Sequence, residues 1–128
     1  MGTRGPSRLV QKDPETFMPL SPAVFHILLA LGDGEAHGYA IMQDVLQRSA
    51  GVVKLGPGTL YGAIGRMLED GFIEECEERP DPEMDDARRR YYRLTQGGGD
   101  LLALETKRLA ALVRSARATK VVRKMKPA

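Results

Sequence analysis

The feature that most constrains the fold is a helix with two unlike sides, predicted at residues 56–71. At 100° per residue its apolar side chains fall within one arc of about 140°, and they are Leu60, Ala63, Ile64, Met67 and Leu68. The other side is small or polar, with Tyr61 on the flank, and carries Gly58, Thr59, Gly62, Gly65, Arg66 and Glu69. Glycine costs a helix about 1 kcal/mol relative to alanine, so three on one side indicate a close approach to another surface. Alternatively, Gly58 belongs to the helix start and the other two are tolerated.

Two helices are predicted before this one. Ser21-Pro22 offers an N-cap hydroxyl followed by a proline at the first helical position. The apolar spacing that follows is helical as far as Leu31, and Gly32-Asp33-Gly34 ends the helix. A second helix is predicted from about His37 to Ser49.

A β-hairpin and a long helix are predicted after residue 71. The strands cover residues 72–79 and 89–94, with a long acidic tip between them. Thr95 caps the last helix, which extends to about residue 119 and has an apolar stripe too long for the small three-helix unit to cover. We therefore expect the stripe to be a dimer interface, formed by Leu102, Leu109, Leu112, Val113 and Ala116.

The order of these elements predicts a mainly α fold with a small β-hairpin: a winged helix-turn-helix with a C-terminal dimerisation helix. The 128 residues leave room for one ordinary domain. We expect a flexible N-terminal arm at residues 1–19 and the winged helix-turn-helix domain at 20–95. The dimerisation helix is expected at 96–119 and a basic tail at 120–128.

Composition excludes several classes of protein. The 19 Lys and Arg against 17 Asp and Glu leave a net charge of +2, which excludes a polybasic or polyacidic disordered chain. The longest apolar run covers only residues 27–31, whereas a membrane span needs about 20 residues. Because the first 20 residues also lack an apolar signal segment, we expect a cytoplasmic protein without a membrane partner. The single cysteine, Cys76, excludes an intrachain disulfide.

The sequence shows no motif typical of a catalytic or metal site. His26, His37 and Cys76 are widely spaced and match no metal-ligand motif. No Ser/His/Asp arrangement, paired-carboxylate motif or phosphate-binding glycine loop stands out. We therefore expect no metal, no cofactor and no enzymatic activity.

Charge is distributed unevenly along the chain. Residues 69–86 contain ten acids and one base, whereas residues 88–93 contain four arginines and no acid. Residues 107–126 contain eight bases and no acid. Such runs are most often solvated surfaces or tails, but basic patches are also what nucleic-acid binding requires.

The chain resembles the PadR family of bacterial transcriptional regulators in several stretches. The most specific are HGYAI at residues 37–41, GPGTLYGAIGRMLEDG at 56–71 and RRRYYRLT at 88–95, in this order. The segments 20–31 and 73–86 extend the likeness, which covers roughly residues 20–95. The short last helix is similar to the subgroup with a single C-terminal helix.

The resemblance implies a homodimeric, sequence-specific repressor of transcription that binds a palindromic operator in double-stranded DNA. It also implies a small-molecule effector, bound between the winged-helix units and the last helices. The major groove admits one helix, whose outward side chains reach bases and phosphates, and an arginine-rich hairpin suits backbone or minor-groove contact. The expected DNA-binding residues are Lys54, Gly58, Thr59, Tyr61, Gly62, Arg66, Arg88, Arg89 and Arg90.

Some of these residues have a second interpretation. Tyr61 could be an aromatic at the edge of the core, and Arg66 a solvated side chain. The hairpin arginines could neutralise the acids on the neighbouring strand. We expect both roles on the hairpin, with some ion pairs inside it and residues 88–90 partly facing DNA.

The chain departs from the family pattern at two places. Gly65 stands where relatives often have lysine, which removes a phosphate contact. The last helix begins with Gly97-Gly98-Gly99, where one glycine is usual, and this run weakens its first turn. These departures and the acidic hairpin leave a second hypothesis, a winged-helix protein-interaction module that has lost DNA binding.

Overall fold

A computed structural model describes residues 13–76 and 90–125 of the chain. Within them, helices make up most of the chain and three short strands form a small antiparallel sheet, which confirms the mainly α fold with a winged helix-turn-helix order. The elements are η1 (Pro14–Phe17), α1 (Pro22–Ala30), β1 (Ala36–His37), α2 (Gly38–Arg48), α3 (Pro57–Glu69), β2 (Ile73–Cys76), β3 (Tyr91–Leu94), α4 (Gln96–Ala118) and α5 (Lys120–Arg123).

Local side-chain contacts set the starts of three helices. The Ser21 hydroxyl accepts a hydrogen bond from the Val24 amide at the start of α1, as the Ser-Pro signal predicts. The Nδ1 atom of His37 accepts one from the Ala40 amide at the start of α2. The Thr95 hydroxyl accepts one from the Gly98 amide at the start of α4. Each contact satisfies an amide that the helix itself leaves without a partner.

The core lies where α1, α2 and α3 meet the sheet and the first turns of α4. The apolar arc predicted on α3 points inward, since Leu60, Ala63, Ile64 and Met67 are all buried. The remaining buried apolar residues come from every neighbouring element: Ile27, Leu28, Leu31, Ile41, Val45, Phe72, Ile73, Tyr92 and Leu101. The non-polar area that these side chains remove from water is the main force holding the elements together.

The sheet has three strands in the order β1-β3-β2, with both pairs antiparallel. Tyr92 on the central strand lies opposite Ala36 on one side and Glu75 on the other. The sequence predicted only the hairpin, because β1 has two residues and is too short to show alternation. The described parts of the predicted strands are β2 and β3, and residues 77–89 lie outside the described chain.

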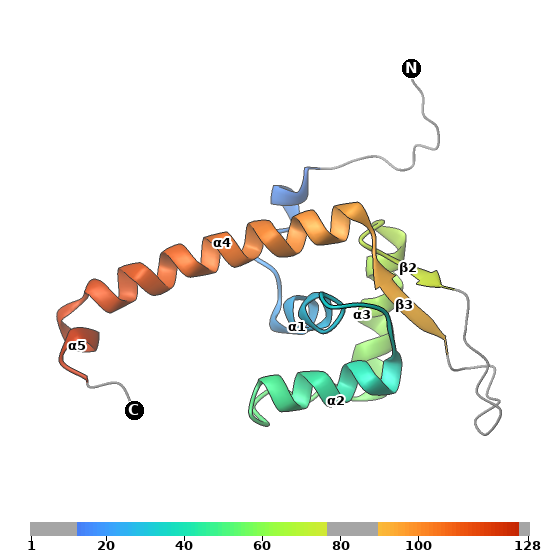
Figure 1. The fold of residues 1–128 in the computed structure, drawn as a ribbon, viewed down its shortest axis with the longest axis horizontal. Coiled ribbons are helices and arrows are strands. Elements are labelled where there is room, and N and C mark those ends of the chain that lie inside the picture. The colour runs from blue at the N-terminus through green and yellow to red at the C-terminus, as the bar shows by residue number, and fades with distance from the viewer. Residues whose placement is uncertain (1–12, 77–89, 126–128) are drawn as a thin grey trace, which may run out of the picture.

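Helix α4 crosses the top of the domain and continues well beyond it (Figure 1). Its first turns pack against α1 and η1, whereas every residue from Ala110 to Ala118 is exposed. The helix is joined to the preceding hairpin by two hydrogen bonds of Thr95. Its hydroxyl donates to the Gly71 carbonyl at 2.6 Å, and its amide donates to the Phe72 carbonyl at 3.0 Å.

Secondary structure is also present in two segments outside the expected domain and dimerisation helix. In the segment expected as an arm, residues 1–19, η1 packs on α4, and the rings of Phe17 and Phe72 meet edge to face with centroids 4.8 Å apart. The expected basic tail, residues 120–128, begins with the short helix α5, which Thr119 caps. None of the helices in the described ranges is long and apolar enough to cross a membrane.

Candidate nucleic-acid interface

The outer side of α3 is open along its length. Thr59, Gly62, Gly65 and Arg66 are exposed, and a Cβ atom added at Gly58 or Gly65 would meet no atom within 4 Å. The apolar arc on the opposite side holds the helix against the core. The structure therefore brings the predicted α3 residues together on one bare helix face.

Arg66 lies along this face. A Cβ atom at Gly62 would be 3.8 Å from one guanidinium nitrogen of Arg66, so the side chain folds back over Gly62 toward the start of the helix. Among the residues that the structure describes, no carboxylate lies within ion-pair distance of this guanidinium. Its donors are thus free to bind an acceptor outside the chain, and the planar fork suits guanine or phosphate.

Tyr61 lies at the edge of the same face and is 45% exposed. The end of its ring rests on Gly38, the first residue of α2, which is buried. Burial raises the pKa of Tyr92 on the sheet, and the charges of Glu75 and Tyr61 add to this effect. The end of the Tyr61 ring therefore lies against the start of α2, with one side of the side chain against the protein and the other in solvent.

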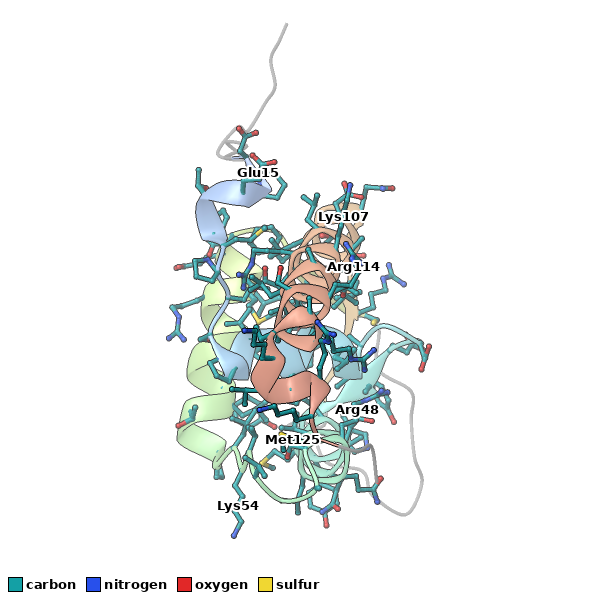
Figure 2. The ribbon with its side chains drawn as sticks, turned by 90° about the vertical axis from the view of Figure 1, so that its left-hand side faces the viewer. Glu15, Arg48, Lys54, Lys107, Arg114 and Met125 are labelled. Atoms are coloured by element: carbon teal, nitrogen blue, oxygen red, sulfur yellow. The ribbon has the colours of Figure 1, made fainter. Side chains whose placement is uncertain are left out.

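Lys54 lies in the connection just before α3 and is exposed. Its side chain points away from the body of the molecule, near the end where α3 begins (Figure 2). This placement adds a positive charge next to the N-terminus of α3, where the free amides and the helix dipole already favour an anion.

Two of the hairpin arginines lie within the described residues, and both form ion pairs. Arg90 forms an ion pair with Glu75 at 3.3 Å, and Arg93 forms one with Glu74 at 2.7 Å. The hydrogen bond with Glu74 raises the pKa of Arg93 above its ordinary value. The expected pairing across the hairpin is therefore present, although both arginines remain more than half exposed. Arg88 and Arg89 lie outside the described residues.

The predicted dimer residues fall into two groups along α4. Leu102 is half-buried and packs on the core of its own domain, close to Gly32, and Leu109 is also half-buried. Leu112 and Val113 are 53% and 48% exposed, and Ala116 is exposed. The apolar stripe is therefore partly covered by its own domain near the start of the helix and bare near its end.

One buried acid on α4 had no counterpart in the sequence-based expectations. Glu105 is 1% exposed, and its carboxylate accepts two hydrogen bonds from Arg108, at 2.6 and 2.8 Å. It accepts a third, at 2.9 Å, from the Leu20 amide just before α1. The bond from Arg108 is the largest cause that holds the pKa of Glu105 below its ordinary value. Glu105 thus fastens the segment that leads into α1 to the long helix.

Comparisons with known proteins show the family of the chain. Residues 27–104 match the model of the PadR-like family of transcriptional regulators. The chain is 33% identical over 89 residues to the transcriptional regulator Rv3488 of Mycobacterium tuberculosis, covering 70% of this chain and 77% of that protein. It is 37% identical over 95 residues to an uncharacterized 37.1 kDa protein in transposon Tn4556 of Streptomyces fradiae, which is 74% of this chain. The chain spans only 25% of the Streptomyces protein.

The fold is similar to that of solved regulators. A PadR family transcription regulator from Clostridium difficile superposes with a TM-score of 0.59 at 23% identity, covering 76% of this chain and 95% of that one. This likeness supports the fold, and the family match covers more than half of the sequence. The chain therefore belongs to the PadR-like family of transcriptional regulators.

Proposed function

We propose that the chain binds double-stranded DNA in a sequence-specific manner, with α3 as the helix that enters the major groove. The observation that carries this proposal is the exposed outer side of α3, where Gly58 and Gly65 face open space and Arg66 has no ion pair within the described residues. Such a face lets the helix backbone approach a groove closely, while its few side chains reach base edges and phosphates.

Positive charges before the start of α3 and on the hairpin support the proposal. Lys54 lies at the start of α3, and the hairpin arginines follow in the sequence, with residues 88–90 as the proposed contacts to the DNA backbone. Contacts of this kind position a protein on the duplex, whereas base contacts select the sequence. In the proposed complex Arg90 exchanges part of its interaction with Glu75 for a phosphate, which its exposure allows.

We propose further that the regulator is a homodimer on a palindromic operator. The exposed part of the stripe on α4, which includes Leu112 and Val113, has no cover within the described chain. A second copy would remove this surface from water, and two-fold symmetry would pair two winged helices with two half-sites about 34 Å apart. The family resemblance supports repression as the mode of regulation. It also supports an effector bound between the winged-helix units and the α4 helices.

The salt dependence of binding tests the proposal against a protein-interaction module. Fluorescence anisotropy of a labelled duplex, taken from the promoter region of the protein's own gene, is measured at several salt concentrations. A DNA-binding dimer gives a linear fall of log K with log salt, of about −0.9 per phosphate neutralised, and binds a scrambled duplex more weakly. Binding without a salt slope, or no binding at all, would instead favour the interaction module.

Sedimentation velocity tests the homodimer with a matched pair of variants. Leu112→Asp with Val113→Asp places two charges on the exposed apolar stripe and should give a folded monomer with much weaker operator binding. Ala111→Asp with Ala118→Asp adds the same charges at exposed positions on the opposite side of α4 and should leave the dimer intact. If the first variant stays dimeric, the interface lies elsewhere on the molecule.

A further inference from the structure

Gly38 and Tyr61 come from different helices and meet at one point. A Cβ atom added at Gly38 would coincide with the space of the Tyr61 hydroxyl oxygen, and would lie 2.8 Å from Cζ and 3.2 Å from Cε1 of the ring. Real Cβ atoms do not approach other atoms this closely. The missing side chain at residue 38 therefore makes the slot that receives the end of the phenol.

The backbone does not require glycine at this position. Gly38 begins a regular helix and is absent from the residues of the described chain with a positive φ angle. The start of α2 is already capped by His37, and alanine forms helices more readily than glycine. The contact with Tyr61 is therefore the physical reason for a residue without a side chain at position 38.

The slot at Gly38 fixes the orientation of the Tyr61 side chain. Because Tyr61 is 45% exposed, its ring has solvent on one side and could rotate outward if the slot were filled. In the present arrangement the end of the phenol lies against the first residue of α2. Its position relative to the outer side of α3 is thus set before any partner arrives.

We propose that Gly38 is a positioning residue for DNA binding, which holds the Tyr61 phenol in the orientation that contacts the duplex. This inference rests on the proposed function. A side chain that is already in its bound orientation loses less conformational entropy when the complex forms. On this view the motif around residue 38 and the motif around residue 61 act as one unit, although α2 and α3 carry them separately.

A double-mutant cycle on operator affinity tests the proposal. Gly38→Ala should displace the phenol and weaken binding by about tenfold, the order expected for a single specific contact. In a Tyr61→Ala background the same substitution should change affinity by less than about twofold, because the side chain that it displaces is gone. Gly99→Ala is the matched control, since it also adds a methyl in the first turn of a helix and meets open space. It should bind as the wild type does.

A measurement without DNA tests the contact itself. The protein has four tyrosines, so labelling with 3-fluorotyrosine gives four resonances in a fluorine NMR spectrum, and Tyr61→Phe identifies the one from residue 61. This resonance should shift in Gly38→Ala and stay in place in Gly99→Ala. Should Gly38→Ala unfold, the double variant with Tyr61→Ala should fold again, because the clash is removed.

The outcomes separate the two proposals. The positioning role alone is overturned if the wild type binds duplexes with the expected salt slope, but Gly38→Ala weakens binding equally in the wild-type and Tyr61→Ala backgrounds. An unshifted residue-61 resonance in Gly38→Ala, or a double variant that stays unfolded, overturns it as well. A wild type that binds no duplex overturns the proposed function and the positioning role together.

Discussion

Helices α3 and α4 each contain three glycines, and these glycines have different neighbours. On α4, a Cβ atom at Gly98 would strike the carbonyl oxygen of Phe72, because the helix start is pressed against the end of the preceding turn. On α3, Gly58 and Gly65 face open space, and Gly62 has only the tip of Arg66 nearby. Gly98 on α4 has a packing reason inside the chain, whereas no such contact explains the glycines on α3, which we propose serve a close approach to DNA.

The glycine run at residues 97–99 has a packing role in addition to its cost for the helix. The sequence predicted that it weakens the first turn of the last helix. The structure shows that Gly98 is required for the close packing of α4 on the hairpin, where Thr95 also bonds to Gly71 and Phe72. Gly99 has no such contact. It therefore lowers helix stability without contributing to the packing of α4.

The largest effect on stability is expected from Gly98→Ala. The added methyl must displace backbone, which is stiffer than a side chain, so the free energy of unfolding should fall by about 3 kcal/mol. Gly99→Ala should raise it by up to about 1 kcal/mol through helix propensity. Urea unfolding followed by circular dichroism measures both. Equal stability of the two variants would contradict the packing role of Gly98.

A second internal contact of α4 should give a smaller, pH-dependent effect. Glu105→Gln weakens the hydrogen bonds from Arg108 and Leu20 and should lower the free energy of unfolding by about 2 kcal/mol at neutral pH. Because the pKa of Glu105 is lower in the folded state than its ordinary value of 4.5, its charged form favours folding. The stabilisation is therefore complete above about pH 4.5 and is lost as the pH falls below that value.

Unfolding curves of the wild type and of Glu105→Gln between pH 3 and pH 7 check this prediction. The stability difference should be largest at pH 7 and shrink toward pH 3. Glu15→Gln is the control, since this residue is exposed. A difference that grows on acidification would mean that Glu105 is protonated in the folded protein.

On the outer side of α3 the expected effects fall on binding rather than on stability. Arg66→Ala should weaken operator binding by about 1–2 kcal/mol, if the guanidinium reaches a base or a phosphate. The melting temperature of the Arg66→Ala variant should match that of the wild type, because the Arg66 side chain has no ion pair within the described chain. Anisotropy and thermal unfolding on the same sample check both statements. Unchanged binding would make Arg66 a solvated residue.

The smallest effect is expected at Gly65. Gly65→Lys should raise the free energy of unfolding by a fraction of about 1 kcal/mol and steepen the salt slope of DNA binding by about one unit. The open space around this residue leaves room for the new side chain. A loss of affinity would instead show that DNA approaches the backbone at Gly65 too closely for any side chain.

Local signals made much of the fold predictable. The caps at Ser21 and Thr95 lie next to the residues they cap, and the apolar arc of α3 repeats with the period of one helix. Sequence periodicity reflects such short-range relations. The helix boundaries and the inner side of α3 were therefore predicted before the structure, and so was the exposure of Thr59 and Arg66.

Contacts between distant segments were not predictable in this way. Glu105 looks like an ordinary solvated acid on a helix, and its burial depends on the Leu20 amide, 85 residues away in sequence. Gly38 and Tyr61 each belong to a separate motif, and neither motif shows that they touch. Strand β1 has only two residues, and it forms because Tyr91 and Tyr92 of β3 supply its partners.

The long overhang of α4 gives the molecule the mechanics of a lever. Its 23 residues make a rod of about 34 Å at 1.5 Å per residue, and it is clamped at one end by Thr95, Gly98 and Glu105. Beyond Glu105, 13 residues remain to the end of the helix, which is about 20 Å, so a tilt of about 10° at the clamp would move the far end by about 3 Å. A small rearrangement near residues 71–72 would thus be magnified at the free end, without any bending of the helix itself.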